Sequence, residues 1–149
     1  QWQNLTTGAY CFYDNNTNNK SIYGCLYNFY TVETNKLAPT GWHIPTDAEW
    51  QTLLTYLGGE TIAGGKLKSS SSLWNVANSC TNNSSGFSGL PGGFRGNIFL
   101  GATYDGDWWS TTVTSDGSGA GGLILFDNCD ASKIETAKRG GLSVRCIKD

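Results

Sequence analysis

One stretch of the sequence, residues 45–58, has the pattern of an amphipathic α-helix, and it constrains the fold more than any other segment. Thr46 is a good N-cap residue, and Glu49 three positions later completes a capping box. An apolar stripe follows at the spacing i, i+3, i+4, i+7, made of Trp50, Leu53, Leu54 and Leu57. The glycine pair at 58–59 ends the pattern. The sequence therefore predicts one clear helix over residues 46–58, with its stripe packed into the core.

The rest of the chain has the pattern of short strands separated by turns and loops. Runs rich in aromatic and β-branched residues alternate with clusters of Gly, Asn, Asp and Ser, which is typical of short antiparallel strands. These runs are residues 10–13, 26–30, 92–95, 108–114, 123–127 and 142–148. Between them, residues 60–90 combine a short helical or turn piece at 63–68 with Ser- and Asn-rich loops. We therefore expect a loop-rich α+β fold with a small antiparallel sheet.

The composition is typical of an extracellular or cell-surface protein. The 149 residues suit one domain, spanning 1–149, with 15% charged residues and as many as six Trp and seven Tyr. The formal net charge is −2 and no run of Lys or Arg occurs, which excludes a phosphate-binding surface for nucleic acid. No apolar run approaches the roughly 18–20 residues of a membrane span, so we expect no span in this chain.

The five cysteines are widely scattered, at positions 11, 25, 80, 129 and 146. No two of them form a CxxC pair, which argues against a zinc site or a thioredoxin-like motif. Their spacing fits one or two long-range disulfides, and it also fits five small buried hydrophobic residues. The sequence alone does not choose between these two interpretations.

Neither catalytic nor metal-binding patterns are present. His43 is the single histidine and leads into the helix cap, where a structural role is expected. The nearest approach to a GxSxG nucleophile elbow, residues 86–90, lacks the final glycine. A zinc site needs three or four clustered ligands. We therefore expect a protein that is not an enzyme, without catalytic residues, metal ligands or cofactors.

Two glycine- or acid-rich stretches have more ordinary explanations than a cofactor site. Residues 117–122 formally fit GxGxxG, but a strand-like run follows them, so we expect a flexible hairpin loop. The acidic stretches 105–107 and 127–130 could supply oxygens to a structural calcium ion. Such short clusters of Asp, Asn and Gly more often form turns.

Six ordered stretches together resemble a known family. They are YGCLYNFYTV (23–32), GWHIPTDAEWQTLLTYLGG (41–59), AGGKLKS (63–69), SSGFSGLPGGFR (84–95), WWSTT (108–112) and GLSVRCIKD (141–149). In order and spacing they are similar to the Fibrobacter succinogenes major paralogous domain, found mainly in secreted proteins of Bacteroidetes. The resemblance covers nearly the whole chain, although the family usually has a further N-terminal stretch that this chain lacks.

The resemblance implies a C-type-lectin-like fold, of the branch that includes the formylglycine-generating enzyme. It also implies secretion and a binding or adhesive role. Members of the family are among the target proteins of diversity-generating retroelements, whose variable residues lie between the GGFR-like and SVRC-like landmarks. In this chain that window is residues 96–139.

We expect the ligand-binding residues to gather on one face within that window. The candidates are Tyr104, Asp105, Asp107, Trp108, Trp109, Phe126, Asn128 and Asp130. Neighbours in a strand face opposite sides, so one of the two tryptophans should lie in the core and the other should reach the binding face. Aromatic side chains there would offer a large, rigid contact area.

Two functional hypotheses follow. The first is a secreted or cell-surface module that binds a protein or glycan on another cell, a phage or a surface structure. The alternative is a structural or assembly subunit, for instance the tip domain of a surface structure. The ligand itself cannot be identified from these residues.

Overall fold

The computed structural model describes residues 1–75 and 80–149 and has a loop-rich α+β fold of short helices and antiparallel strands. This confirms the predicted class. The α-helices are α1 (Asn19–Tyr23), α2 (Phe29–Val32), α3 (Asp47–Tyr56) and α4 (Glu60–Leu67), and two 3-10 turns cover Trp2–Asn4 and Tyr13–Asn15. The strands of the first half are β1 (Tyr10–Cys11), β2 (Leu26–Asn28) and β3 (Trp42–His43). Those of the second half are β4 (Phe94–Arg95), β5 (Phe99–Leu100), β6 (Gly106–Val113), β7 (Gly119–Leu125), β8 (Ala131–Ala137), β9 (Gly141–Leu142) and β10 (Ile147–Lys148).

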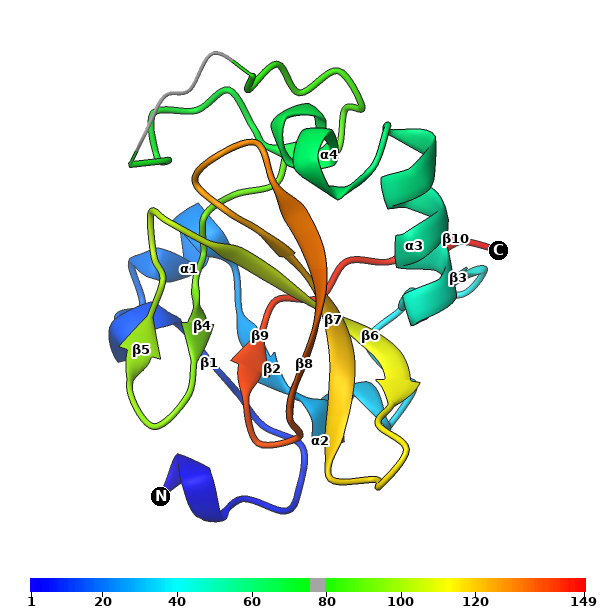
Figure 1. Cartoon of the computed structure of the whole chain (residues 1–149). Helices are drawn as coiled ribbons and strands as arrows, with labels where there is room; N and C mark the ends of the chain where they lie inside the picture. The colour runs from blue at the N-terminus through cyan, green and yellow to red at the C-terminus, as the bar shows by residue number, and fades with distance from the viewer. Residues whose placement is uncertain (76–79) are drawn as a thin grey trace.

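Three long strands, β6, β7 and β8, form the central sheet (Figure 1). They are antiparallel and consecutive along the chain, with Trp108 opposite Leu123 and Leu123 opposite Lys133. Around this sheet the remaining strands are short. A five-stranded sheet has the order β1-β2-β9-β4-β5, and β10 pairs with β3. The last residues of the chain therefore lie beside the segment that leads into α3.

Helix α3 begins as the capping box predicts. The Thr46 hydroxyl accepts from the backbone N–H of Glu49, and the Glu49 carboxylate accepts from the backbone N–H of Thr46 at 2.8 Å. Trp50, Leu54 and Leu57 of the predicted stripe are buried, and Leu53 is partly buried and packs against them. The helix ends at Tyr56, slightly before the glycine pair, with Leu57 as its C-cap.

The core has two parts, one on each face of the central sheet. Trp108 packs with the α3 stripe, with α4 and with Leu123 and Leu125 of β7. Trp109 points to the other face, toward Phe29, Ile44 and Leu142. Its indole N–H donates to the backbone carbonyl of Tyr27 at 2.7 Å. The two neighbouring tryptophans thus anchor opposite faces of one strand, as the alternation of side chains along a strand requires.

Most of the glycine-rich stretch expected to be a hairpin loop is instead buried strand. Gly117 and Ser118 do lie in the turn between β6 and β7, but residues 119–122 belong to β7, so the prediction is wrong for them. A Cβ atom on Gly121 would lie 2.2 Å from a carboxylate oxygen of Asp47, and one on Gly122 would lie 2.6 Å from the Trp108 carbonyl oxygen. Glycine is required at position 122, because the β6 backbone lies in the place of a side chain, and at position 121 any side chain would displace the Asp47 carboxylate.

Other strand expectations also differ from the structure: Phe29 and Tyr30, at the end of the expected run 26–30, begin helix α2. Strand β8 (Ala131–Ala137) was not expected, because its Ser, Lys, Glu and Thr residues hide the period-2 pattern. Residues 142–148 do not form one strand. They include the end of β9 and the whole of β10, which belong to different sheets.

One of the two cysteine interpretations now holds. Cys80 and Cys129 form a disulfide, with a Cα–Cα distance of 5.9 Å and a sequence separation of 49. Cys11, Cys25 and Cys146 are free and partly buried. The disulfide connects the loop after α4 to the turn between β7 and β8.

Candidate functional site

Five of the predicted ligand-binding residues gather at one end of the central sheet. Gly106 pairs with Leu125, so the residues before β6 lie beside the residues after β7. We call this set the loop face; it consists of Tyr104, Asp105, Phe126, Asn128 and Asp130. In Figure 1 the turn between β7 and β8 is the orange loop at the upper end of the sheet. Tyr104 is 49% exposed, Asn128 is exposed, and the other three are partly buried.

The turn between β7 and β8 is held by its own hydrogen bonds. The backbone N–H of Phe126 donates to the carbonyl of Asp130 at 3.2 Å. The Asn128 side chain accepts from the backbone N–H of Asp130 at 2.7 Å and donates to the Asp130 carboxylate at 2.9 Å. Asn128 and Asp130 therefore have a structural role in the turn, whatever else they contact.

A buried lysine, Lys68, supports this turn from beneath. Its ammonium group donates to the carbonyl oxygens of Asp127, at 3.0 Å, and Asn128. It also lies 5.0 Å from the centre of the Trp74 ring. Burial lowers the pKa of Lys68, and the charges of Asp127 and Asp130 oppose that shift. Together with the Cys80–Cys129 disulfide, Lys68 holds the turn between β7 and β8, which carries Phe126, Asn128 and Asp130 of the loop face.

The remaining three predicted residues are buried in the scaffold. Trp109 is 0% exposed, Trp108 6% and Asp107 2%. The expectation that one indole reaches the surface is wrong, because helices cover one face of β6 and the five-stranded sheet and α2 cover the other. Asp107 is likewise not a surface residue, because it points to the same face as Trp109.

The Asp107 carboxyl group is an unusual member of the core. Its Oδ2 atom has no hydrogen-bond partner among the described residues. Burial, and then the nearby charge of Asp105, raises the pKa of Asp107 to about 8. Asp105 itself has a raised pKa, first through burial and then through the charge of Asp127. Asp107 is therefore protonated at neutral pH.

The acidic stretches do not fit a calcium ion. In the part of the chain that the structure describes, no three His, Cys, Asp or Glu side chains are grouped so that they could hold a metal. Asn128 and Asp130 bond to one another as residues of a turn do. Calcium prefers several charged or carbonyl oxygens at once, and these residues do not offer such a set.

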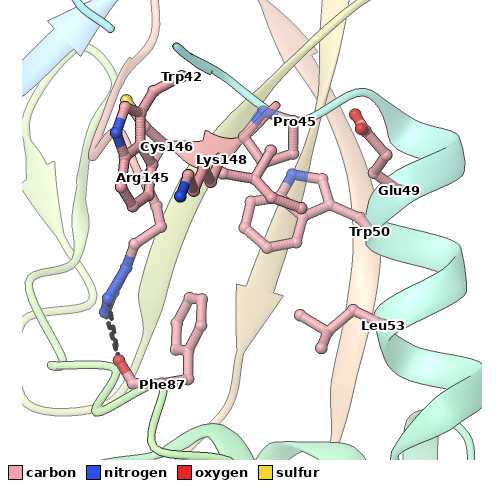
Figure 2. A pocket seen from close by; sticks show the side chains of 10 residues that line it. Trp42, Pro45, Glu49, Trp50, Leu53, Phe87, Arg145, Cys146 and Lys148 are labelled. Atoms are coloured by element: carbon pink, nitrogen blue, oxygen red, sulfur yellow. Dashed lines mark hydrogen bonds between the residues drawn. The ribbon is translucent and has the colours of Figure 1, made fainter. Parts of the chain in front are cut away.

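A second candidate site, which the sequence did not reveal, is an aromatic pocket beside α3 (Figure 2). The cavity has a volume of about 320 Å³. Its apolar lining comes from Trp42, Pro45, Trp50, Leu53, Phe87 and Ile147, and its other lining residues are Glu49, Arg145, Cys146 and Lys148. Four separate segments contribute to it, so no local motif could have predicted it.

His43 lies at the edge of this region, between two carboxylates. Its Nε2 atom is 2.8 Å from Glu49 Oε1, and its Nδ1 atom is 2.7 Å from Asp149 Oδ1. The hydrogen bond with Asp149, followed by that with Glu49, raises the pKa of His43. The pKa of Glu49 is lowered, mainly by the backbone N–H of Thr46 and then by His43. His43 thus ties the end of the chain to the start of α3.

These features define a loop-rich α+β protein with a supported loop face and a separate aromatic pocket. The family model of the Fibrobacter succinogenes major domain matches residues 1–148. The chain therefore belongs to this family. No curated protein and no solved structure matches the chain significantly. Across the described residues, none of the helices has the length and apolar character needed to cross a membrane.

Proposed function

We propose that this protein is a secreted or cell-surface module that binds a protein or glycan ligand through the loop face, and that it is not an enzyme. The ligand would be carried by another cell, a phage or a surface structure. Exposed loops carry binding best when a rigid scaffold positions them. The composition, with few charges and many aromatic residues, supports an extracellular setting.

The observation that carries this proposal is the support beneath the loop face. Lys68 and the Cys80–Cys129 disulfide hold the turn between β7 and β8 from below, while Tyr104 presents its ring to solvent next to that turn. A preorganised surface loses little conformational entropy when it binds, so more of the contact energy appears as affinity. Tyrosine is favoured in such surfaces because it offers a large contact area with few rotatable bonds.

Family membership also supports a C-type-lectin-like ancestry and diversification of the window 96–139, both of which we include in the proposal. The burial of individual residues refines that idea. Tyr104, Asp105 and Phe126 are exposed or partly buried, whereas Asp107 lies in the core, so we expect variation at the first three. A gene for a reverse transcriptase beside this one, with a near-copy of the DNA encoding residues 96–139, would be the expected genomic arrangement.

A pair of tyrosine variants tests the binding role. The labelled protein should bind a subset of the surfaces in a panel of glycans and intact bacterial cells, and Tyr104→Ala should weaken that binding about tenfold or more. The matched control is Tyr56→Ala, because Tyr56 is 85% exposed on α3, outside the loop face. Both variants should keep their free energy of unfolding within about 0.5 kcal/mol of the parent.

Two outcomes would contradict the proposal. One is binding that Tyr104→Ala leaves unchanged while Tyr56→Ala reduces it. The other is the absence of binding to every surface in the panel.

A further inference from the structure

The aromatic pocket of Figure 2 has three ring-bearing walls. Trp42 lies on β3 and is 44% exposed, which is unusual for so large an apolar side chain. Trp50 lies on α3, and its ring meets that of Phe87 edge to face, with the ring centres 6.2 Å apart. No residue of the loop face lines this cavity, so the two sites are separate. An open apolar cavity of this size is suited to one ring of a small molecule rather than to an extended chain.

The fourth wall is an arginine with unused hydrogen-bonding capacity. The Arg145 guanidinium stacks on the Phe87 ring, 4.1 Å from the ring centre. Its Nη1 and Nη2 atoms both donate to the backbone carbonyl of Phe87, the first at 2.9 Å. A guanidinium group carries five N–H donors, so donors remain for a further acceptor. The stacking and these bonds hold the group in place before any ligand arrives.

Within residues 1–75 and 80–149, neither Arg145 nor Lys148, the second cation of the pocket, has an acidic partner. The ion pairs recorded among the described residues are His43–Glu49, His43–Asp149 and Lys138–Glu33. The nearby carboxylates are thus already engaged: Glu49 by His43 and Thr46, and Asp149 by His43. In Figure 2 the Arg145 and Lys148 side chains lie on one side of the pocket, and Trp50 and Leu53 on the other.

This arrangement leaves a partly buried positive charge beside an apolar cavity. Burial lowers the pKa of Arg145, since the cation is removed from water without a compensating anion. A bound anion would supply that compensation, and charge-assisted hydrogen bonds to a guanidinium are among the stronger polar contacts. A carboxylate also matches the planar geometry of the guanidinium group.

We propose that the pocket binds a small aromatic carboxylate, with the ring between Trp42, Trp50 and Phe87 and the carboxylate on Arg145 and Lys148. This inference does not rest on the loop face. The pocket and the loop face would act as two sites on one module, one for a small molecule and one for a larger ligand.

Titration with 3-phenylpropionate tests the proposal on the intact protein. The indole N–H signals of Trp42 and Trp50 in a proton–nitrogen NMR spectrum should shift, and those of Trp2 and Trp74 should not. We expect a dissociation constant on the order of 1 mM for a ligand of this size. The neutral analogue 3-phenylpropionamide should bind about tenfold more weakly, because it lacks the charge.

Charge-reversal variants provide the matched control. Lys148 is exposed, so Lys148→Glu should fold normally and weaken 3-phenylpropionate binding about tenfold. Lys133→Glu makes the same change of charge on an exposed residue outside the pocket and should have no such effect. Trp42→Ala should also weaken binding.

Several results would overturn the proposal. Equal affinity for 3-phenylpropionate and 3-phenylpropionamide would show that Arg145 and Lys148 do not bind the carboxylate. Shifts confined to other tryptophans would place the ligand elsewhere. Binding of phenyl phosphate without binding of 3-phenylpropionate would show that the anion is a phosphate, not a carboxylate.

Discussion

Replacement of both Cys80 and Cys129 by alanine is expected to lower the free energy of unfolding by about 2–4 kcal/mol. The disulfide closes a loop with a sequence separation of 49, so its loss frees a long segment of the unfolded chain. It also joins the turn between β7 and β8 to the segment after α4. Loss of the bond should therefore loosen the turn of the loop face as well as destabilise the whole protein.

Chemical denaturation with and without a reductant measures this effect. The reductant should destabilise the parent protein by about the same amount as the double substitution and should leave the double variant unchanged. Cys146→Ser is the matched control, because Cys146 is a free and partly buried thiol. A parent protein whose stability does not respond to reductant would contradict the disulfide.

The second large effect concerns pH and the buried carboxyl group of Asp107. Its pKa is raised from 3.8 to about 8, so the folded protein retains a proton that the unfolded chain has lost. The stabilisation of the folded state by the proton on Asp107 is fully present below pH 3.8, and it is lost as the pH rises through about 8. Between these values the contribution of Asp107 should fall by up to roughly 1.4 kcal/mol per pH unit.

Asp107→Asn isolates this contribution, because the amide is nearly the same size and does not titrate. The difference in the free energy of unfolding between Asp107→Asn and the parent should shift steadily in favour of the variant from pH 4 to pH 8. Asp14→Asn makes the same substitution at an exposed carboxyl group and is the matched control. A difference for Asp107→Asn that does not depend on pH would show that Asp107 is ionised in the folded state.

Local patterns predicted the parts of the fold that local interactions determine. The capping box at Thr46 and the stripe of Trp50, Leu54 and Leu57 gave α3 nearly to its ends. The glycines of β7 misled the prediction, because glycine in sequence favours a loop. Here it marks a close approach between β7 and α3 that depends on the tertiary fold.

In the candidate sites too, local sequence predicted some features, and others depend on the tertiary fold. The pairing of β6 with β7 brings five of the eight predicted residues to one end of the sheet, whereas Asp107, Trp108 and Trp109 lie in the core. It could not be foreseen that both neighbouring tryptophans would be covered, because that depends on elements packed on both faces. Lys68 carried no signal beyond its place in the stretch AGGKLKS. The aromatic pocket carried none, since its lining comes from Trp42, α3, Phe87 and the chain end.

Saturation mutagenesis, scored at once for folding and for binding, tests the central claim most directly. Protease resistance would report folding, and retention on a surface that the parent binds would report binding. At Tyr104 and Phe126, most substitutions should preserve folding and abolish binding. At Trp108 and Trp109, most should abolish folding. The account would be contradicted if folded variants at Tyr104 and Phe126 bound as the parent does.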